Sequence, residues 1–133
     1  MLCHYPLIFA LEGRDVTLPC YIKNEKLESE RFEWMNDDKN VYLYEGGQLP
    51  DQDDQFRGRV SHFDNELNDG NGSITISDTK VSDSGFYTCN FPNLHQTFTV
   101  RLVVGEHISM FPLMVHVVTE ALFLFISSDL SRN

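Results

Sequence analysis

The sequence predicts an all-β fold of antiparallel strands, arranged as a sandwich or a barrel. One observation is a series of short β-rich runs separated by turn signals, and another is that no segment before residue 106 keeps a 3.6-residue apolar period. The third is size, because 133 residues, 41% of them hydrophobic, can close one core but not two. We expect one domain over residues 5–105 and a tail of different character over residues 106–133.

The first three predicted strands cover residues 16–21, 31–35 and 41–44. The first alternates polar and apolar side chains around Thr17. In the second, Phe32 and Trp34 fall on one side and Glu33 and Met35 on the other. The third, Val-Tyr-Leu-Tyr, is rich in strand-forming residues and is followed by a Gly-Gly turn pair.

Four further strands are predicted over residues 59–63, 73–77, 86–91 and 98–104. In the run Ser-Ile-Thr-Ile-Ser at 73–77, both isoleucines fall on the inward side. Polar stretches connect the predicted strands at residues 36–40, 48–55 and 64–72. We interpret 64–72 as a solvated hairpin with an Asn-Gly turn, because Asp69 and Thr75 replace the Gly and Glu that a calcium-binding EF-hand loop requires.

The most specific signal in the chain is the spacing of Cys20, Trp34 and Cys89. The tryptophan follows the first cysteine by 14 residues, and the second cysteine follows the tryptophan by 55. The second cysteine also ends the run Asp-Ser-Gly-Phe-Tyr-Thr-Cys at residues 83–89. Together these features resemble an immunoglobulin domain, and the length between the cysteines favours the variable type over the seven-strand constant type.

This resemblance implies a variable-type immunoglobulin sandwich, in which two antiparallel sheets with Greek-key connections are joined by a disulfide between Cys20 and Cys89. Trp34 is then expected to pack beside the sulfur atoms. A bridge that closes a loop of 69 residues stabilises the fold by about 4 kcal/mol on the chain-entropy relation. Such a bridge requires an oxidising compartment, which predicts a secreted or cell-surface protein.

The residues before the second cysteine predict a tyrosine corner of the kind found in such sandwiches. Tyr87 shares the inward side of its strand with the cysteine, and its hydroxyl is expected to bond back to the backbone. Gly85 permits the tight corner, and Asp83 is positioned to pair with Arg59 at the end of the sandwich.

A more specific resemblance covers residues 12–104, which look like the variable-type domain of the butyrophilin and myelin-oligodendrocyte-glycoprotein family. The matching runs are Val-Thr-Leu-Pro-Cys at 16–20, Val-Tyr-Leu-Tyr-Glu-Gly-Gly at 41–47, Asp-Gln-Phe-Arg-Gly-Arg at 54–59, Asn-Gly-Ser-Ile-Thr-Ile at 71–76 and Val-Ser-Asp-Ser-Gly-Phe-Tyr-Thr-Cys at 81–89. The Phe-Arg-Gly-Arg run is the most family-specific. The last strand lacks the Gly-x-Gly bulge of antigen-receptor chains. This family is related to costimulatory ligands, which implies a cell-surface role in tuning T-cell responses.

Strand alternation predicts a binding face on the sheet formed by strands G, F, C and C′. We expect Val41 and Leu43 to pack inward, which turns Tyr42 and Tyr44 outward. The predicted face consists of Glu33, Met35, Tyr42, Tyr44, Thr88, Asn90, Thr99 and Arg101, with Leu94 as an exposed apolar tip of the F–G loop. The family resemblance implies that its partner is a protein receptor or counter-ligand on another cell. The alternatives are a homodimer in homophilic adhesion and an ordinary solvated surface.

Composition and motifs exclude several other functions. With 20 Asp and Glu against 10 Lys and Arg, the net charge of −10 argues against nucleic acid and anionic lipid as partners. No Gly-x-Ser-x-Gly or His-Glu-x-x-His motif is present, so we expect no enzyme, no metal site and no cofactor. Asn71 begins the sequence Asn-Gly-Ser, a predicted glycosylation site on the hairpin.

The two ends of the chain leave alternatives open. Residues 1–10 lack a basic region and are too short in apolar character for a signal peptide, so we expect the leader to be missing from this sequence. Residues 113–126 form an apolar run of 14 that contains His116 and Glu120, whereas a membrane span needs about 20. Membrane association through 108–126, a truncated anchor, an alternative terminus and a disordered tail all stay open. Cys3 is interpreted as unpaired, as intermolecular or as part of a misassigned terminus.

Overall fold

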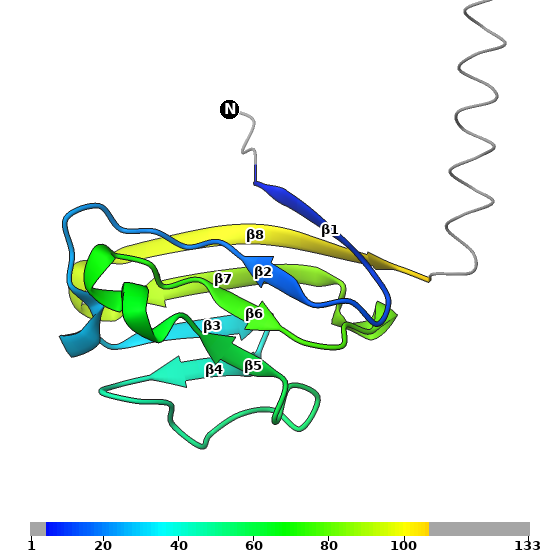
Figure 1. Cartoon of the computed structure of the whole chain (residues 1–133), viewed down its shortest axis with the longest axis horizontal. Helices are drawn as coiled ribbons and strands as arrows, with labels where there is room; N and C mark the ends of the chain where they lie inside the picture. The colour runs from blue at the N-terminus through cyan, green and yellow to red at the C-terminus, as the bar shows by residue number, and fades with distance from the viewer. Residues whose placement is uncertain (1–4, 107–133) are drawn as a thin grey trace, which may run out of the picture.

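The computed structural model describes residues 5–106, which form two β-sheets packed face to face (Figure 1). The larger sheet has five strands in the order β1 (Leu7–Leu11), β8 (Gln96–Gly105), β7 (Gly85–Phe91), β3 (Phe32–Asn36) and β4 (Lys39–Tyr44). The smaller sheet has three strands in the order β2 (Val16–Leu18), β6 (Ile74–Ile76) and β5 (Val60–His62). The connections in this part of the chain include the 3₁₀ helices η1 (Leu27–Ser29), η2 (Asp64–Asp69), η3 (Val81–Asp83) and η4 (Pro92–Leu94).

Strand β1 is the one element of the larger sheet that the sequence pattern does not predict. It pairs in parallel with β8, whereas the other strand pairs of the described chain are antiparallel. Its sequence is apolar at every position, so no alternation marks the exposed side. In the structure Ile8 and Ala10 pack towards the core, while Leu7 and Phe9 are exposed on the opposite side.

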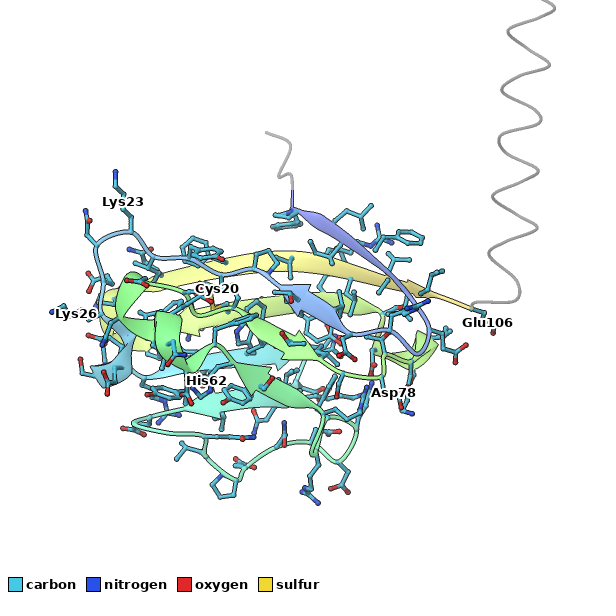
Figure 2. The ribbon with its side chains drawn as sticks, in the orientation of Figure 1. Cys20, Lys23, Lys26, His62, Asp78 and Glu106 are labelled. Carbon is cyan, nitrogen blue, oxygen red and sulfur yellow. A yellow bond between two sulfur atoms is a disulfide. The ribbon has the colours of Figure 1, made fainter. Side chains whose placement is uncertain are left out.

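A disulfide ties the two layers together. It joins Cys20, which follows β2, to Cys89 in the middle of β7, with the two Cα atoms 6.6 Å apart (Figure 2). Both cysteines are buried. The predicted two-sheet sandwich and its inter-sheet disulfide are therefore confirmed.

Trp34 fills the centre of the core and is fully buried. Its indole N–H donates a hydrogen bond of 2.9 Å to the carbonyl oxygen of Gly72, which satisfies the polar atom of this large side chain. A Cβ at Gly72 would lie 2.9 Å from the ring of Phe91, so a glycine is needed where this backbone approaches the core. The sequence analysis did not single out Gly72, because the contact joins segments 38 residues apart.

The tyrosine corner is present at the end of the sandwich. The buried hydroxyl of Tyr87 donates a hydrogen bond to the carbonyl oxygen of Asp83. Gly85 has a φ of 147°, and a Cβ there would come within 3.0 Å of the amide nitrogen of Asn36. Burial raises the pKa of the Tyr87 hydroxyl, and the charge of Asp83 adds to that effect.

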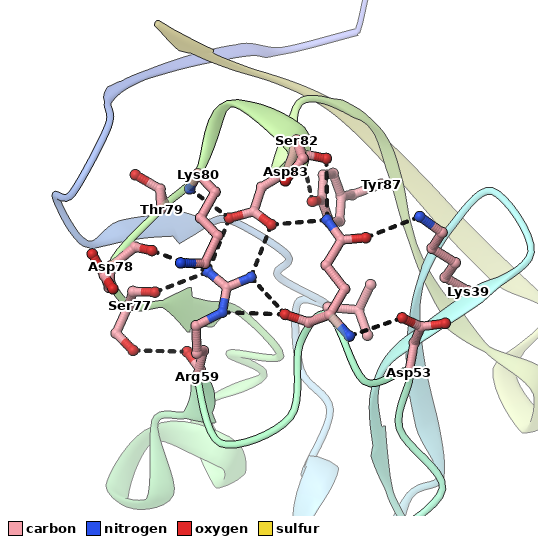
Figure 3. A network of polar contacts seen from close by, with 12 residues as sticks. Lys39, Asp53, Arg59, Ser77, Asp78, Thr79, Lys80, Ser82, Asp83 and Tyr87 are labelled. Carbon is pink, nitrogen blue, oxygen red and sulfur yellow. Dashed lines mark hydrogen bonds and ion pairs between the residues drawn. The ribbon is translucent and has the colours of Figure 1, made fainter. Parts of the chain in front are cut away.

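Asp83 also forms the centre of a buried polar network (Figure 3). Its carboxylate accepts two hydrogen bonds of 2.9 Å from the guanidinium of Arg59, one of 2.8 Å from the backbone N–H of Lys80 and one of 3.0 Å from the side chain of Gln55. Burial alone would raise the pKa of Asp83, but these donors and the charge of Arg59 lower it below its ordinary value. The same carboxylate raises the pKa of Arg59.

The connection between β5 and β6 differs from its predicted form. Residues 64–69 form η2 instead of a solvated hairpin, and the side chain of Leu67 within it is buried. Asn71 is only 2% exposed, and its side-chain oxygen accepts a 3.0 Å hydrogen bond from the backbone N–H of Ser73. The interior position of Asn71 contradicts the predicted exposed hairpin, and glycosylation of Asn71 stays a prediction.

The predictions for Cys3 and for the apolar run after residue 106 fall outside the described residues. Within residues 5–106, no helix has the length and hydropathy to cross a membrane.

Candidate binding face

The pairing register defines which side chains leave the core of the larger sheet. Trp34 and Cys89 are buried and lie opposite each other on β3 and β7, so their neighbours along each strand point outward. We call this outward side the outer face. Its successive rows across the strands are Glu33–Asn90–Thr97, Met35–Thr88–Thr99 and Phe86–Arg101–Leu7.

Six of the nine predicted face residues lie together on the outer face. They are Glu33, Met35, Thr88, Asn90, Thr99 and Arg101. Arg101 is exposed, whereas the other five are partly exposed. These six residues of β3, β7 and β8 therefore share one side of the sheet, and binding through them stays a prediction.

Tyr42 and Tyr44 do not belong to this face, and the prediction that they point outward is wrong. They are 1% and 4% exposed. Tyr42 lies opposite Trp34 and Tyr44 opposite Phe32, so both share the inward side of the sheet with the core aromatics. Leu43 instead lies opposite Glu33 on the outer face. The two tyrosines were assigned from hydrophobicity, but their rings fill the core better than the smaller aliphatic side chains would.

The hydroxyls of the two tyrosines find partners at the edge of the core. The Tyr42 hydroxyl contacts Nδ1 of His62 on β5, and Nε2 of His62 lies 2.6 Å from a carboxylate oxygen of Asp64. A carboxylate only accepts, so Nε2 carries a proton, and in the neutral ring Nδ1 then accepts from the tyrosine. Burial raises the pKa of Tyr42 to about 12, with added contributions from Asp64 and Tyr44. The Tyr44 hydroxyl donates to the carbonyl oxygen of Glu28.

The first row of the outer face is a hydrogen-bonded polar ladder. The amide of Asn90 donates to the carboxylate of Glu33 at 3.1 Å, and the hydroxyl of Thr97 donates to the oxygen of Asn90 at 2.8 Å. Glu33 also lies 3.8 Å from the guanidinium of Arg31, at the exposed margin of the sheet. These bonds order the side chains across three strands.

The loop between β7 and β8 does not present the predicted apolar tip. Leu94 ends η4, is half-buried and packs against the core. The exposed side chains of this loop are the neighbouring Asn93 and His95. A 3₁₀ turn that begins with Pro92 rotates the leucine inward, which alternation along a strand cannot predict.

The sequence analysis missed an apolar group at the end of the outer face nearest β1. Tyr5, Leu7, Phe9 and Phe86 are 46–58% exposed. Phe86 was part of the tyrosine-corner motif, and its position next to the inward Tyr87 was a signal that it points outward. The other three could not be placed without the pairing of β1 to β8.

The side chains of residues 5–106 include no group of three or more His, Cys, Asp or Glu that could hold a metal ion. Both ring nitrogens of His62 are engaged by Tyr42 and Asp64, so the ring is not an open ligand.

Comparison with known proteins identifies the family of this domain. Residues 6–104 match the immunoglobulin V-set domain family. Human butyrophilin subfamily 2 member A2 is 28% identical over 105 residues, which cover 74% of this chain and 20% of the relative. Mouse programmed cell death 1 ligand 1 is 33% identical over 82 residues, which cover 58% of this chain and 28% of the relative.

Among solved structures, bovine butyrophilin superposes with a TM-score of 0.68 at 28% identity, over 76% of this chain and 51% of that chain. The chain thus spans less than a third of the two curated relatives and about half of the butyrophilin crystal structure. The family match, in contrast, covers most of the chain. The chain belongs to the immunoglobulin V-set family and is related to the butyrophilins and to programmed cell death 1 ligand 1.

Proposed function

We propose that this domain is a recognition module that binds a protein receptor or counter-ligand on another cell through the outer face, in the regulation of T-cell responses. The observation that carries the proposal is the composition of the larger sheet. Its five strands contain one acidic residue, Glu33, although the chain has 20. A surface with Met, Phe, Arg and few carboxylates is typical of the core of a protein interface.

Two further points support this function. The V-set family and the immune ligands related to this chain are not enzyme families, and one of these relatives is named as a ligand. The disulfide between Cys20 and Cys89 also requires an oxidising compartment, which favours the extracellular side of the plasma membrane or secretion.

The proposal is tested with fluorescent tetramers of the 133-residue chain on activated T cells. Thr88 lies at the centre of the outer face, and Thr17 is exposed on β2 of the smaller sheet. We expect Thr88→Tyr to lower binding at least about tenfold, because the added ring blocks the face, and Thr17→Tyr to leave it unchanged. Equal binding of both variants would contradict the outer face as the site.

Homophilic adhesion is measured in the same preparation. Sedimentation velocity over a range of concentrations reports whether the chain forms a symmetric dimer. A dimer that Thr88→Tyr disrupts, in a protein that stains no cells, would replace the receptor-binding proposal.

A further inference from the structure

We propose that the partner binds to a patch at one end of the outer face. This patch fits a protein surface on which a carboxylate lies among apolar side chains. This inference rests on the proposed function and adds the place and the chemistry of the contact. The patch, called here the Phe86 patch, consists of Tyr5, Leu7, Phe9, Phe86, Arg101 and Val103.

The register of three strands brings this patch together. Arg101 on β8 lies between Phe86 on β7 and Leu7 on β1, so the three share one row. Phe9 and Val103 pair with each other and form the next row on the same side. Apart from Tyr5, which precedes β1, the patch is therefore held on paired backbone, and binding through these strand residues requires no ordering of a loop.

Contacts within the patch fix its aromatic part. The rings of Tyr5 and Phe86 meet edge to face with their centroids 6.0 Å apart. The guanidinium carbon of Arg101 lies 5.6 Å from the centroid of the Phe86 ring. Such pre-arranged aromatic and guanidinium groups lose little conformational freedom on binding, as residues at interface hot spots do.

The apolar side chains are concentrated here. The large hydrophobic residues that are exposed in residues 5–106 are Tyr5, Leu7, Phe9, Tyr21, Val81 and Phe86, and four of these six belong to the patch. Single exposed apolar residues are normal, whereas a contiguous group marks an interaction site. The opposite end of the same face is the polar ladder of Glu33, Asn90 and Thr97.

Charge identifies the partner's chemistry. Arg101 contacts the Phe86 ring, and no carboxylate of the described residues lies within 4 Å of its guanidinium. The sole acid of the larger sheet, Glu33, is occupied by Asn90 and Arg31. A carboxylate from a partner would complete a charge-assisted pair on a guanidinium already partly shielded by apolar groups.

Charge also disfavours a second copy of this chain as the molecule that binds the Phe86 patch. Two copies each carry a net charge of −10 and repel at long range. A two-fold contact through the Phe86 patch would set each Arg101 against a surface without an acidic residue.

The test uses tetramers of the 133-residue chain on activated T cells, with thermal unfolding of each variant as the check on folding. Phe86→Ser and Arg101→Met are expected to lower binding at least about tenfold, and Arg101→Lys, which keeps the charge, to bind within about threefold of wild type. The matched control is Arg14→Met, which removes an exposed arginine outside the patch and should bind like wild type.

The outcomes separate this inference from the proposed function. If Thr88→Tyr abolishes binding while Phe86→Ser and Arg101→Met bind like wild type, the outer face is the site and the patch is not. If Phe86→Ser lowers binding but Arg101→Met does not, the carboxylate is refuted. If the wild-type chain stains no cells, the proposed function fails and this inference with it. A micromolar homodimer that Phe86→Ser dissociates would make a second copy the occupant and overturn the inference.

Discussion

Replacing Asp83 by Asn should destabilise the domain far more than a change at any exposed ion pair. The Asp83 carboxylate is fully buried and accepts four hydrogen bonds, two of them from Arg59. An amide has one acceptor oxygen, so its NH₂ group would face a donor and at least one of these bonds would be lost. Arg59, with a side chain 13% exposed, would keep its charge without a counterion. Removing one partner of a buried pair costs about 3–5 kcal/mol, which we expect for Asp83→Asn.

The chain contains a matched control in the exposed pair between Arg57 and Asp54. Its side chains are 64% and 88% exposed, although the two atoms lie only 2.6 Å apart. Asp54→Asn should therefore cost less than about 1 kcal/mol. The free energy of unfolding is measured by urea titration of the oxidised chain at neutral pH. If the two variants lose the same free energy, burial does not determine the value of the pair and the reasoning is refuted.

The pH dependence gives the same prediction a second readout. The pKa of Asp83 is lowered in the folded state, so its stabilising contribution is present above the pKa of the unfolded chain, about 4, and is lost as pH falls towards the folded value. The stability difference between wild type and Asp83→Asn should therefore shrink as pH falls below about 4. A difference that stays constant from neutral to acidic pH would show that the charge plays no part.

Three further predictions concern the core. Cys89→Ser should cost about 4 kcal/mol, because the disulfide closes a loop of 69 residues, and urea unfolding that matches the oxidised wild type would contradict this. Tyr44→Ala should cost about 3–5 kcal/mol, since its buried ring stacks on Phe32 at 4.9 Å, and a variant that loses binding but not stability would return the residue to the binding face. The pKa of Tyr42 is raised from 10.0 to about 12 in the folded state, so its contribution to stability is fully present below pH 10 and is lost as pH rises towards 12. The alkaline loss of thermal stability should be smaller in Tyr42→Phe, and an unchanged loss would exclude Tyr42 as its cause.

The sequence predicts the centre of this fold well because its signals are local and mutually consistent. Alternation in residues 73–77 and in the run before Cys89 places side chains correctly, since each strand has one buried and one exposed side. The cysteine spacing then relates the two sheets. These features depend on residues within a strand or on a single long-range bond, so they can be predicted without knowing which strands pair.

Errors arise where pairing decides the orientation. On β4, four consecutive residues are buried, so hydrophobicity cannot tell the inward side from the outward one. A shift of register at Trp34 and Met35 adds a further residue to the count on β4. At the edge strand β1, all five residues are apolar, so hydrophobicity cannot show which two of them are exposed. The residues that share the outer face were therefore predicted on β3, β7 and β8 but not at the two margins of that face.

Under the proposed function, the inward side of the larger sheet stabilises the fold and the outward side binds the partner. Inward side chains such as Tyr44 and Tyr87 are packed or bonded to the core, so changing them alters the folding equilibrium. Phe86 lies next to Tyr87 in the chain, yet it is 46% exposed and its recorded partners are Tyr5 and Arg101, on the same surface. Its large apolar ring contributes little burial to the folded domain, so a stability requirement does not account for an aromatic residue there. The proposed contact with a partner would account for it, because that contact would remove from water the ring surface that folding leaves exposed.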